Sequence, residues 1–181
     1  MNTVSTDYFY LGFFVVVTLS MFAFGAIIRE SRRKYIRKLS AMFLKGQYQD
    51  IIKYGQAKYE KEAFSEYFKE GIAMSVIASA LMIDDYNLAF AYIDKLTLKK
   101  ASQIKAVYYM DALILSGDNS KAVEVFSDFS DRKDPISIDI VVKYKPYFDF
   151  IAIGKPIDEA FLQTIKSPIQ NKIYTKIRGK L

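Results

Sequence analysis

The segment Gly117–Phe126, GDNSKAVEVF, is the clearest local signature in this chain of 181 residues. It joins two segments whose apolar residues recur at helical spacing, and Asp118 is placed to cap the second segment. Ala122 lies four residues before Phe126, so both side chains fall on one face of that second helix. The segment therefore predicts a helical hairpin with helices over residues 102–116 and 119–129.

Two earlier turns follow the same pattern. Gly46-Gln-Tyr48 leads to Ile51, and Asp84-Asp-Tyr86 leads to Ala89. Each turn opens on Gly or Asp and reaches a small or branched apolar residue five positions later. The flanking segments again show helical periodicity, and no segment shows the alternation of a half-buried strand. We therefore predict an all-α fold built from repeated helical hairpins.

The repeated turn resembles that of the tetratricopeptide repeat superfamily, in which a unit of about 34 residues consists of two helices joined by a short turn. The resemblance covers residues 32–165. It implies an α-solenoid of three to four hairpins. In the fourth hairpin, Asp134-Pro135 is expected to open the first helix. Pro146 is expected to kink or split that helix, and Gly154 to end it before a partner helix starts at Pro156.

The resemblance also implies a binding surface. Tetratricopeptide arrays present a concave groove, lined by their first helices, that holds a peptide or a helix of a partner protein. An apolar groove would suit a hydrophobic segment or an amphipathic helix. If the assigned register is wrong, the same residues are ordinary core. The predicted groove residues are Met74, Ala78, Leu81, Ile104, Val107, Asp111 and Ile114.

The N-terminal segment Tyr8–Ile28, YFYLGFFVVVTLSMFAFGAII, contains no Asp, Glu, Lys or Arg. As a helix with a rise of about 1.5 Å per residue, it is long enough to cross a bilayer core of about 30 Å. A cleaved signal peptide would have a basic start and a shorter apolar run. We therefore predict a single transmembrane helix over residues 8–28.

Basic residues follow this segment directly, within residues 29–38. The positive-inside rule keeps this end in the cytoplasm, and it places residues 1–7 outside the cell membrane. The basic segment is expected to continue the helix and to lie near anionic lipid. Its basic residues are Arg29, Arg32, Arg33, Lys34, Arg37 and Lys38.

The C-terminal segment, residues 166–181, reads as a basic amphipathic helix. Ile169, Ile173 and Ile177 recur every four residues among lysines. Such a helix can lie on an anionic membrane surface, or it can cap the open end of a repeat stack. Both alternatives are consistent with the sequence.

The composition argues against several classes of function. The chain has no histidine and no cysteine, so the usual general base, thiol chemistry and ordinary zinc sites are missing. The net charge of +6 comes from the two basic ends, while the body between them is mildly acidic, which argues against a nucleic-acid-binding face. The adjacent acids Asp84 and Asp85 are expected to serve a turn and a helix cap. We expect no enzyme activity, cofactor or metal.

These observations predict a single-pass cell membrane protein whose cytoplasmic helical-repeat domain binds a partner protein at the bilayer. An alternative is a structural subunit that is permanently packed within a larger membrane complex. A further alternative is a sensor of anionic lipid surfaces that uses the two basic ends.

Overall fold

The computed structural model describes the backbone of residues 3–63, 65–97 and 102–178, and their side chains from residue 17 to residue 177. This described part is all-α and contains nine helices. The chain forms two compact units, residues 1–41 and residues 42–181, which are considered separately below.

The first unit consists of helix α1 (Thr3–Leu44), whose last turn enters the second unit. The helix runs without interruption through the apolar segment and the basic segment, as the absence of Pro and the helical spacing predict. Among the side chains that the structure describes, no helix combines the length and the apolar character needed to cross a bilayer. The predicted span over residues 8–28 lies partly outside those side chains, and it stays a prediction.

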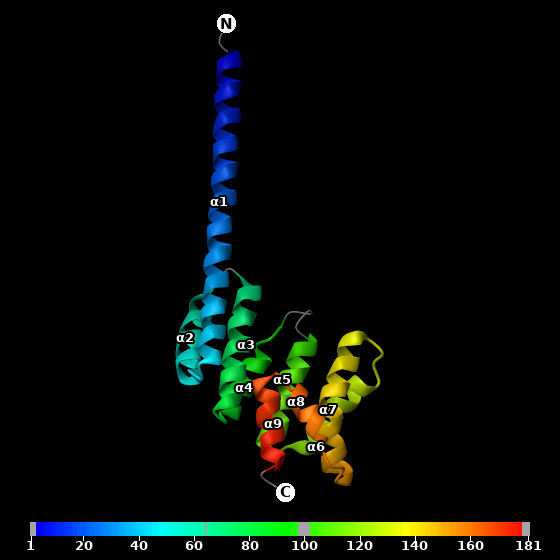
Figure 1. Cartoon of the computed structure of the whole chain (residues 1–181). Coiled ribbons are helices and arrows are strands. Elements are labelled where there is room, and N and C mark those ends of the chain that lie inside the picture. Colours follow the sequence, from blue (N-terminus) through cyan, green and yellow to red (C-terminus); the bar gives the residue numbers. More distant parts are fainter. Residues whose placement is uncertain (1–2, 64, 98–101, 179–181) are drawn as a thin grey trace. The chain divides into compact units, whose positions relative to one another are not determined.

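The second unit contains eight helices within its described residues (Figure 1). From α2 to α7 each helix packs against the next, and α3 also packs against α5. This sequential packing confirms the all-α fold. The helices are α2 (Tyr48–Lys61), α3 (Glu66–Met82), α4 (Tyr86–Asp94), α5 (Ser102–Ser116), α6 (Asn119–Ser130), α7 (Pro135–Ile153), α8 (Glu159–Thr164) and α9 (Pro168–Arg178).

The three turns with a shared sequence pattern have the same backbone geometry. Gly46, Asp84 and Gly117 adopt left-handed φ values of +71°, +64° and +96°. In each turn, the amide of the following residue donates to the carbonyl oxygen five residues earlier, at 3.0, 3.0 and 2.9 Å. This bond satisfies a carbonyl that the end of a helix would otherwise leave unpaired. The turns that the sequence pattern relates are therefore structurally equivalent.

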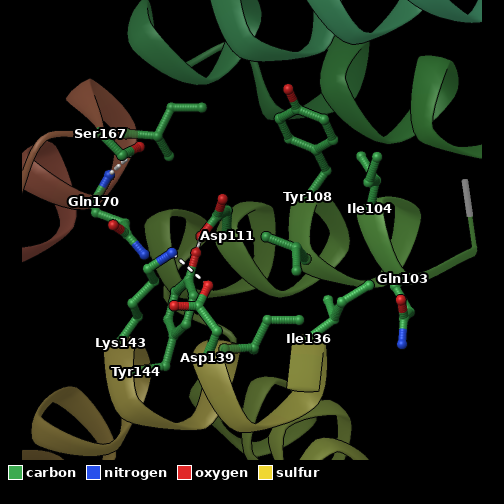
Figure 2. A pocket seen from close by; sticks show the side chains of 13 residues that line it. Gln103, Ile104, Tyr108, Asp111, Ile136, Asp139, Lys143, Tyr144, Ser167 and Gln170 are labelled. Carbon is green, nitrogen blue, oxygen red and sulfur yellow. Dashed lines mark hydrogen bonds and ion pairs between the residues drawn. The ribbon is translucent and has the colours of Figure 1, made fainter. Parts of the chain in front are cut away.

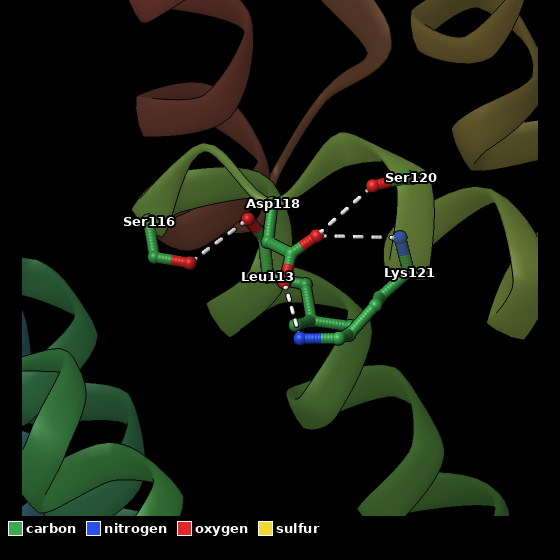
Figure 3. A network of polar contacts seen from close by, with 5 residues as sticks. All are labelled: Leu113, Ser116, Asp118, Ser120 and Lys121. Atoms are coloured by element: carbon green, nitrogen blue, oxygen red, sulfur yellow. Dashed lines mark hydrogen bonds and ion pairs between the residues drawn. The ribbon is translucent and has the colours of Figure 1, made fainter.

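The residue after the left-handed position caps the next helix in two of these turns. The side chain of Asp85 accepts a hydrogen bond from Leu88 N at 3.1 Å. Asp118 accepts hydrogen bonds from Lys121 N at 3.4 Å and from Ser120 Oγ at 3.2 Å (Figure 3). The acidic pair at residues 84 and 85 thus has the turn and cap roles that the sequence predicts.

Close packing follows at the fifth position after each left-handed residue. Ile51, Ala89 and Ala122 stand there, and all three are 0% exposed. Four residues beyond Ile51, a Cβ atom added to Gly55 would lie 2.6 Å from Val76 Cγ2, so α2 and α3 approach closely at this point. The repeat pattern in the sequence therefore marks the points where consecutive helices meet.

The helical spacing of the apolar residues that include Phe64 predicts a helix from about Ala63 to Ile83, and α3 begins three residues later, at Glu66. Ser65 sets this boundary because its side chain accepts a hydrogen bond from Phe68 N at 3.3 Å. Phe64, which the sequence placed on the inward face, lies outside the described residues.

The fourth hairpin departs further from the prediction. Gly154 ends α7 in the left-handed conformation as expected, but Pro146 does not split this helix. The buried side chains of Tyr144 and Tyr147 hold the turns on either side of the proline, so tertiary packing outweighs its helix-breaking tendency. The partner helix α8 is only six residues long and has no buried residue. It starts at Glu159, later than Pro156, because Asp158 caps it by accepting from Ala160 N at 2.9 Å.

We expect Ala122→Leu to destabilise the second unit by about 1–3 kcal/mol, because the larger side chain overpacks a fully buried position. Val123→Leu is the matched control, since Val123 is the next residue on the same helix and is 45% exposed. Urea unfolding of the full-length chain measures both effects. Equal stability of the two variants would show that α6 does not pack closely at Ala122.

Candidate functional site

A pocket of about 430 Å³ lies within the second unit, between α5, α7 and the start of α9 (Figure 2). It opens on the face of α5 that the repeat resemblance assigns to ligand binding. Its lining residues are Gln103, Ile104, Val107, Tyr108 and Asp111 from α5, Ile136, Asp139, Ile140, Lys143 and Tyr144 from α7, and Ser167, Ile169 and Gln170 from the α9 segment.

The walls of the pocket are mostly apolar. Ile104 and Val107 are three residues apart on α5, and Ile136 and Ile140 are four apart on α7, so each pair lies on one face of its helix. Ile140 is buried, whereas Ile104 and Ile136 keep 43% and 56% of their surface exposed. A ligand in this pocket would therefore cover apolar surface that the free protein leaves in solvent.

Asp111 is a buried carboxyl group of this pocket, and its residue is only 3% exposed. One carboxyl oxygen accepts a hydrogen bond from the hydroxyl of Tyr144 at 2.5 Å, which ties α5 to α7. Burial raises the pKa of Asp111 to about 7, and the bond from Tyr144 offsets this only in part. Burial also raises the pKa of Tyr144, and the neighbouring charge of Asp111 adds to the effect. Asp111 therefore changes its charge near neutral pH.

Polar contacts hold the rim of the pocket. Lys143 Nζ pairs with Asp139 Oδ2 at 2.5 Å along α7. Gln103 Nε2 donates to Asp134 Oδ1 at 3.2 Å. Asp134 also caps α7, accepting from Ser137 N at 3.0 Å, so the same carboxylate that starts α7 also connects it to α5. The mutual position of the two pocket helices is therefore fixed by specific bonds.

The helix α9 forms the third side of the pocket and packs against α3 and α5. Ile173, Tyr174 and Ile177 of its apolar stripe are buried, and the hydroxyl of Tyr174 donates to Lys143 O at 2.7 Å. The apolar stripe of the C-terminal segment is therefore covered by other helices of the protein, which favours the packing alternative over the membrane-surface alternative.

Two lysines of α9 bind the C-terminal ends of other helices. Lys172 Nζ donates to Leu81 O at 2.8 Å and to Met82 O at 2.9 Å, and it pairs with Asp84 at 2.8 Å. Lys176, one turn further, donates to Leu115 O. Carbonyl groups at a helix C-terminus lack intrahelical partners and carry partial negative charge, so both lysines stabilise these ends.

The predicted groove residues fall into three groups. Ile104, Val107 and Asp111 line the pocket, Ile104 with 43% of its surface exposed and Asp111 from a buried position. Leu81 and Ile114 are 0% and 4% exposed and belong to the core, so their assignment to an open groove is wrong. They lie near the C-terminal ends of α3 and α5, which are the ends that α9 reaches. The remaining two groove residues, Met74 and Ala78, are half-buried on α3 and do not line this pocket.

The sequence did not identify the contributions of α7 and α9 to this site. Ile136 and Ile140 are four residues apart, a spacing that indicates one apolar helix face, and Ile169 was predicted only as part of an amphipathic stripe. Nothing in these patterns indicated that the two faces meet the face of α5.

The predicted topology residues lie on α1 in the first unit. Arg33, Lys34, Arg37 and Lys38 are exposed, and Arg29 Nε donates to Gly25 O at 3.2 Å. Arg32, the sixth of these residues, is half-buried.

No protein-family model, curated protein or solved structure matches this chain.

We predict that the stability of the protein falls as the pH rises through neutrality, because of Asp111. Between about pH 4 and pH 7, the folded protein holds a proton on Asp111 that the unfolded chain has released. This contribution should lower the free energy of unfolding by up to about 3 kcal/mol between pH 5 and pH 8. Asp111→Asn keeps an acceptor for Tyr144 but removes the titration, so its stability should depend less on pH.

Urea unfolding of the full chain and of Asp111→Asn at pH 5 and pH 8 measures this difference. The stability of the variant relative to the unmodified protein should increase at the higher pH. A constant difference at both pH values would contradict the prediction.

Proposed function

We propose that this protein is a membrane-anchored adaptor whose tetratricopeptide-like helical repeats bind a hydrophobic or amphipathic segment of a partner protein. The pocket between α5, α7 and α9 is the proposed binding site. The observation that carries this proposal is an apolar-walled pocket, open to solvent, on the first-helix face of an otherwise closely packed repeat unit.

The equivalent turns support the assignment to tetratricopeptide-like repeats. Three first helices end on a left-handed residue, and the helix that follows buries the residue five positions later. Contact between α3 and α5, the first helices of successive hairpins, is also typical of this architecture. Ligands of such arrays commonly lie on the first-helix face, and Ile104 and Val107 are available there.

The membrane anchor is proposed from the sequence of residues 8–28 and is supported by the exposure of the later part of this segment. Leu19, Met21, Phe22, Phe24 and Ile27 are each between 63% and 71% exposed. At about 100° per residue these positions surround the helix, whereas a helix that packs on a protein buries one apolar stripe. Apolar side chains on all sides are suited to a lipid environment.

The basic residues after this segment set the proposed orientation, with the N-terminus outside and the repeat domain in the cytoplasm. A protease added to intact cells should leave a tag at the C-terminus uncut, because the membrane shields it. Replacing Arg29, Arg32, Arg33 and Lys34 with Gln should weaken or invert this bias. Removal of the tag from the unmodified protein on intact cells would refute the orientation.

Site-specific photocrosslinking in cells tests the binding site. A photoreactive residue at position 104 should link the protein to one discrete partner, because this position lines the pocket and is 43% exposed. Position 123 on α6 is the matched control, since it is 45% exposed and does not line the pocket. The linked partner is identified by mass spectrometry. The same products from both positions, or none from position 104, would contradict the proposed site.

A further inference from the structure

We infer that the pocket between α5, α7 and α9 receives a lysine or arginine side chain of the partner segment, with the cationic group on Asp111 and the apolar stem along Ile104, Val107 and Ile140. This inference rests on the proposed adaptor function and names the chemistry that the site recognises.

The first argument is the state of the Asp111 carboxyl group. Its residue is 3% exposed, and Tyr144 binds one of its two oxygens at 2.5 Å. The other oxygen points away from Tyr144 (Figure 2). Among the described residues, no donor is bound to this second oxygen. The described residues include no fully buried side-chain oxygen that lacks a hydrogen-bond partner, so this second oxygen keeps contact with the pocket space. A cationic donor from a ligand in the pocket would bond to it there.

The second argument is the balance of charge around Asp111. The pocket is lined by two carboxylates, Asp111 and Asp139, and by one ammonium group, Lys143. Lys143 Nζ is already paired with Asp139 at 2.5 Å. The other polar groups facing the pocket are the neutral side chains of Tyr108, Tyr144, Gln103, Gln170 and Ser167. When Asp111 is ionised, the pocket carries one uncompensated negative charge, which a cationic ligand neutralises.

The third argument is the shape and lining of the pocket. A volume of about 430 Å³ lies at the lower end of the range of about 300–1,000 Å³ that is typical of ligand pockets. Lysine and arginine combine an apolar stem with a charged end, and they bury the stem along apolar surface. An acidic side chain would be repelled by Asp111, and a purely apolar one would leave the carboxylate buried without a partner. A basic side chain covers the apolar walls with its stem and pairs its charged end with Asp111.

The test uses n-butylammonium as the probe and n-butanol as its uncharged counterpart. The full-length chain is prepared in a non-ionic detergent with labelled isoleucine δ1 methyl groups. At pH 8, butylammonium should shift the methyl resonances of Ile104 and Ile140 at concentrations at least tenfold below those needed for butanol. Asp111→Asn should abolish this preference, whereas Asp128→Asn, which removes an exposed carboxylate of α6 outside the pocket, should retain it. Equal responses to the two probes, or an unchanged preference in Asp111→Asn, would overturn the inference.

A pH comparison on the unmodified protein provides a second measurement that does not depend on the variant folding. Because the pKa of Asp111 lies at about 7, binding of butylammonium should be at least tenfold weaker at pH 5.5 than at pH 8. Binding that does not change with pH would count against Asp111 as the receptor. If these measurements fail but a discrete crosslink forms at position 104, the adaptor site stands and only the basic ligand is refuted. If no crosslink forms, the adaptor site itself is refuted.

Discussion

The left-handed residue that ends a first helix is the constraint on which the second unit depends. It reverses the chain, and it allows the next amide to bond to the carbonyl five residues earlier. Glycine adopts this conformation at little cost at positions 46 and 117. At position 84 an aspartate does so, and Asp is among the few other residues that enter this region routinely. Its side chain is 58% exposed, so the ion pair with Lys172 is partly screened by solvent and offsets only part of the backbone cost. The three reversals place Ile51, Ala89 and Ala122 where consecutive helices meet.

The C-terminal helix uses the electrostatics of these helix ends. Lys172 and Lys176 are four residues apart on α9, so they lie on the same side of the helix. Each lysine donates to carbonyls at the end of a different first helix, α3 or α5. Two of the basic residues in the C-terminal segment therefore bind carbonyl groups within the protein. Together with the buried isoleucines, these contacts determine how much of the first-helix face stays open.

At the pocket, the preference of a carboxyl group for water conflicts with the packing of α5 against α7. A carboxyl group on the inward face of α5 must be buried if α5 and α7 are to pack, and burial disfavours its charged form. The hydroxyl of Tyr144 relieves this conflict only in part, which leaves Asp111 to titrate near neutral pH. Conflicts of this kind commonly occur at functional sites, where a ligand can supply the missing interaction. A basic side chain would do so here, with the apolar walls excluding water from the ion pair.

The sequence alone determined most of the helices and turns of this protein, because capping, left-handed residues and helical periodicity act over only a few residues. The predicted helix over residues 102–116 coincides with α5, and Asp134-Pro135 and Gly154 bound α7 as expected. Only the tertiary structure decided which apolar residues remain open. Leu81 and Ile114 belong to the same predicted faces as Val107, yet they are buried. Periodicity shows that a face is apolar, but the element that covers it can come from a distant part of the chain, as α9 does here.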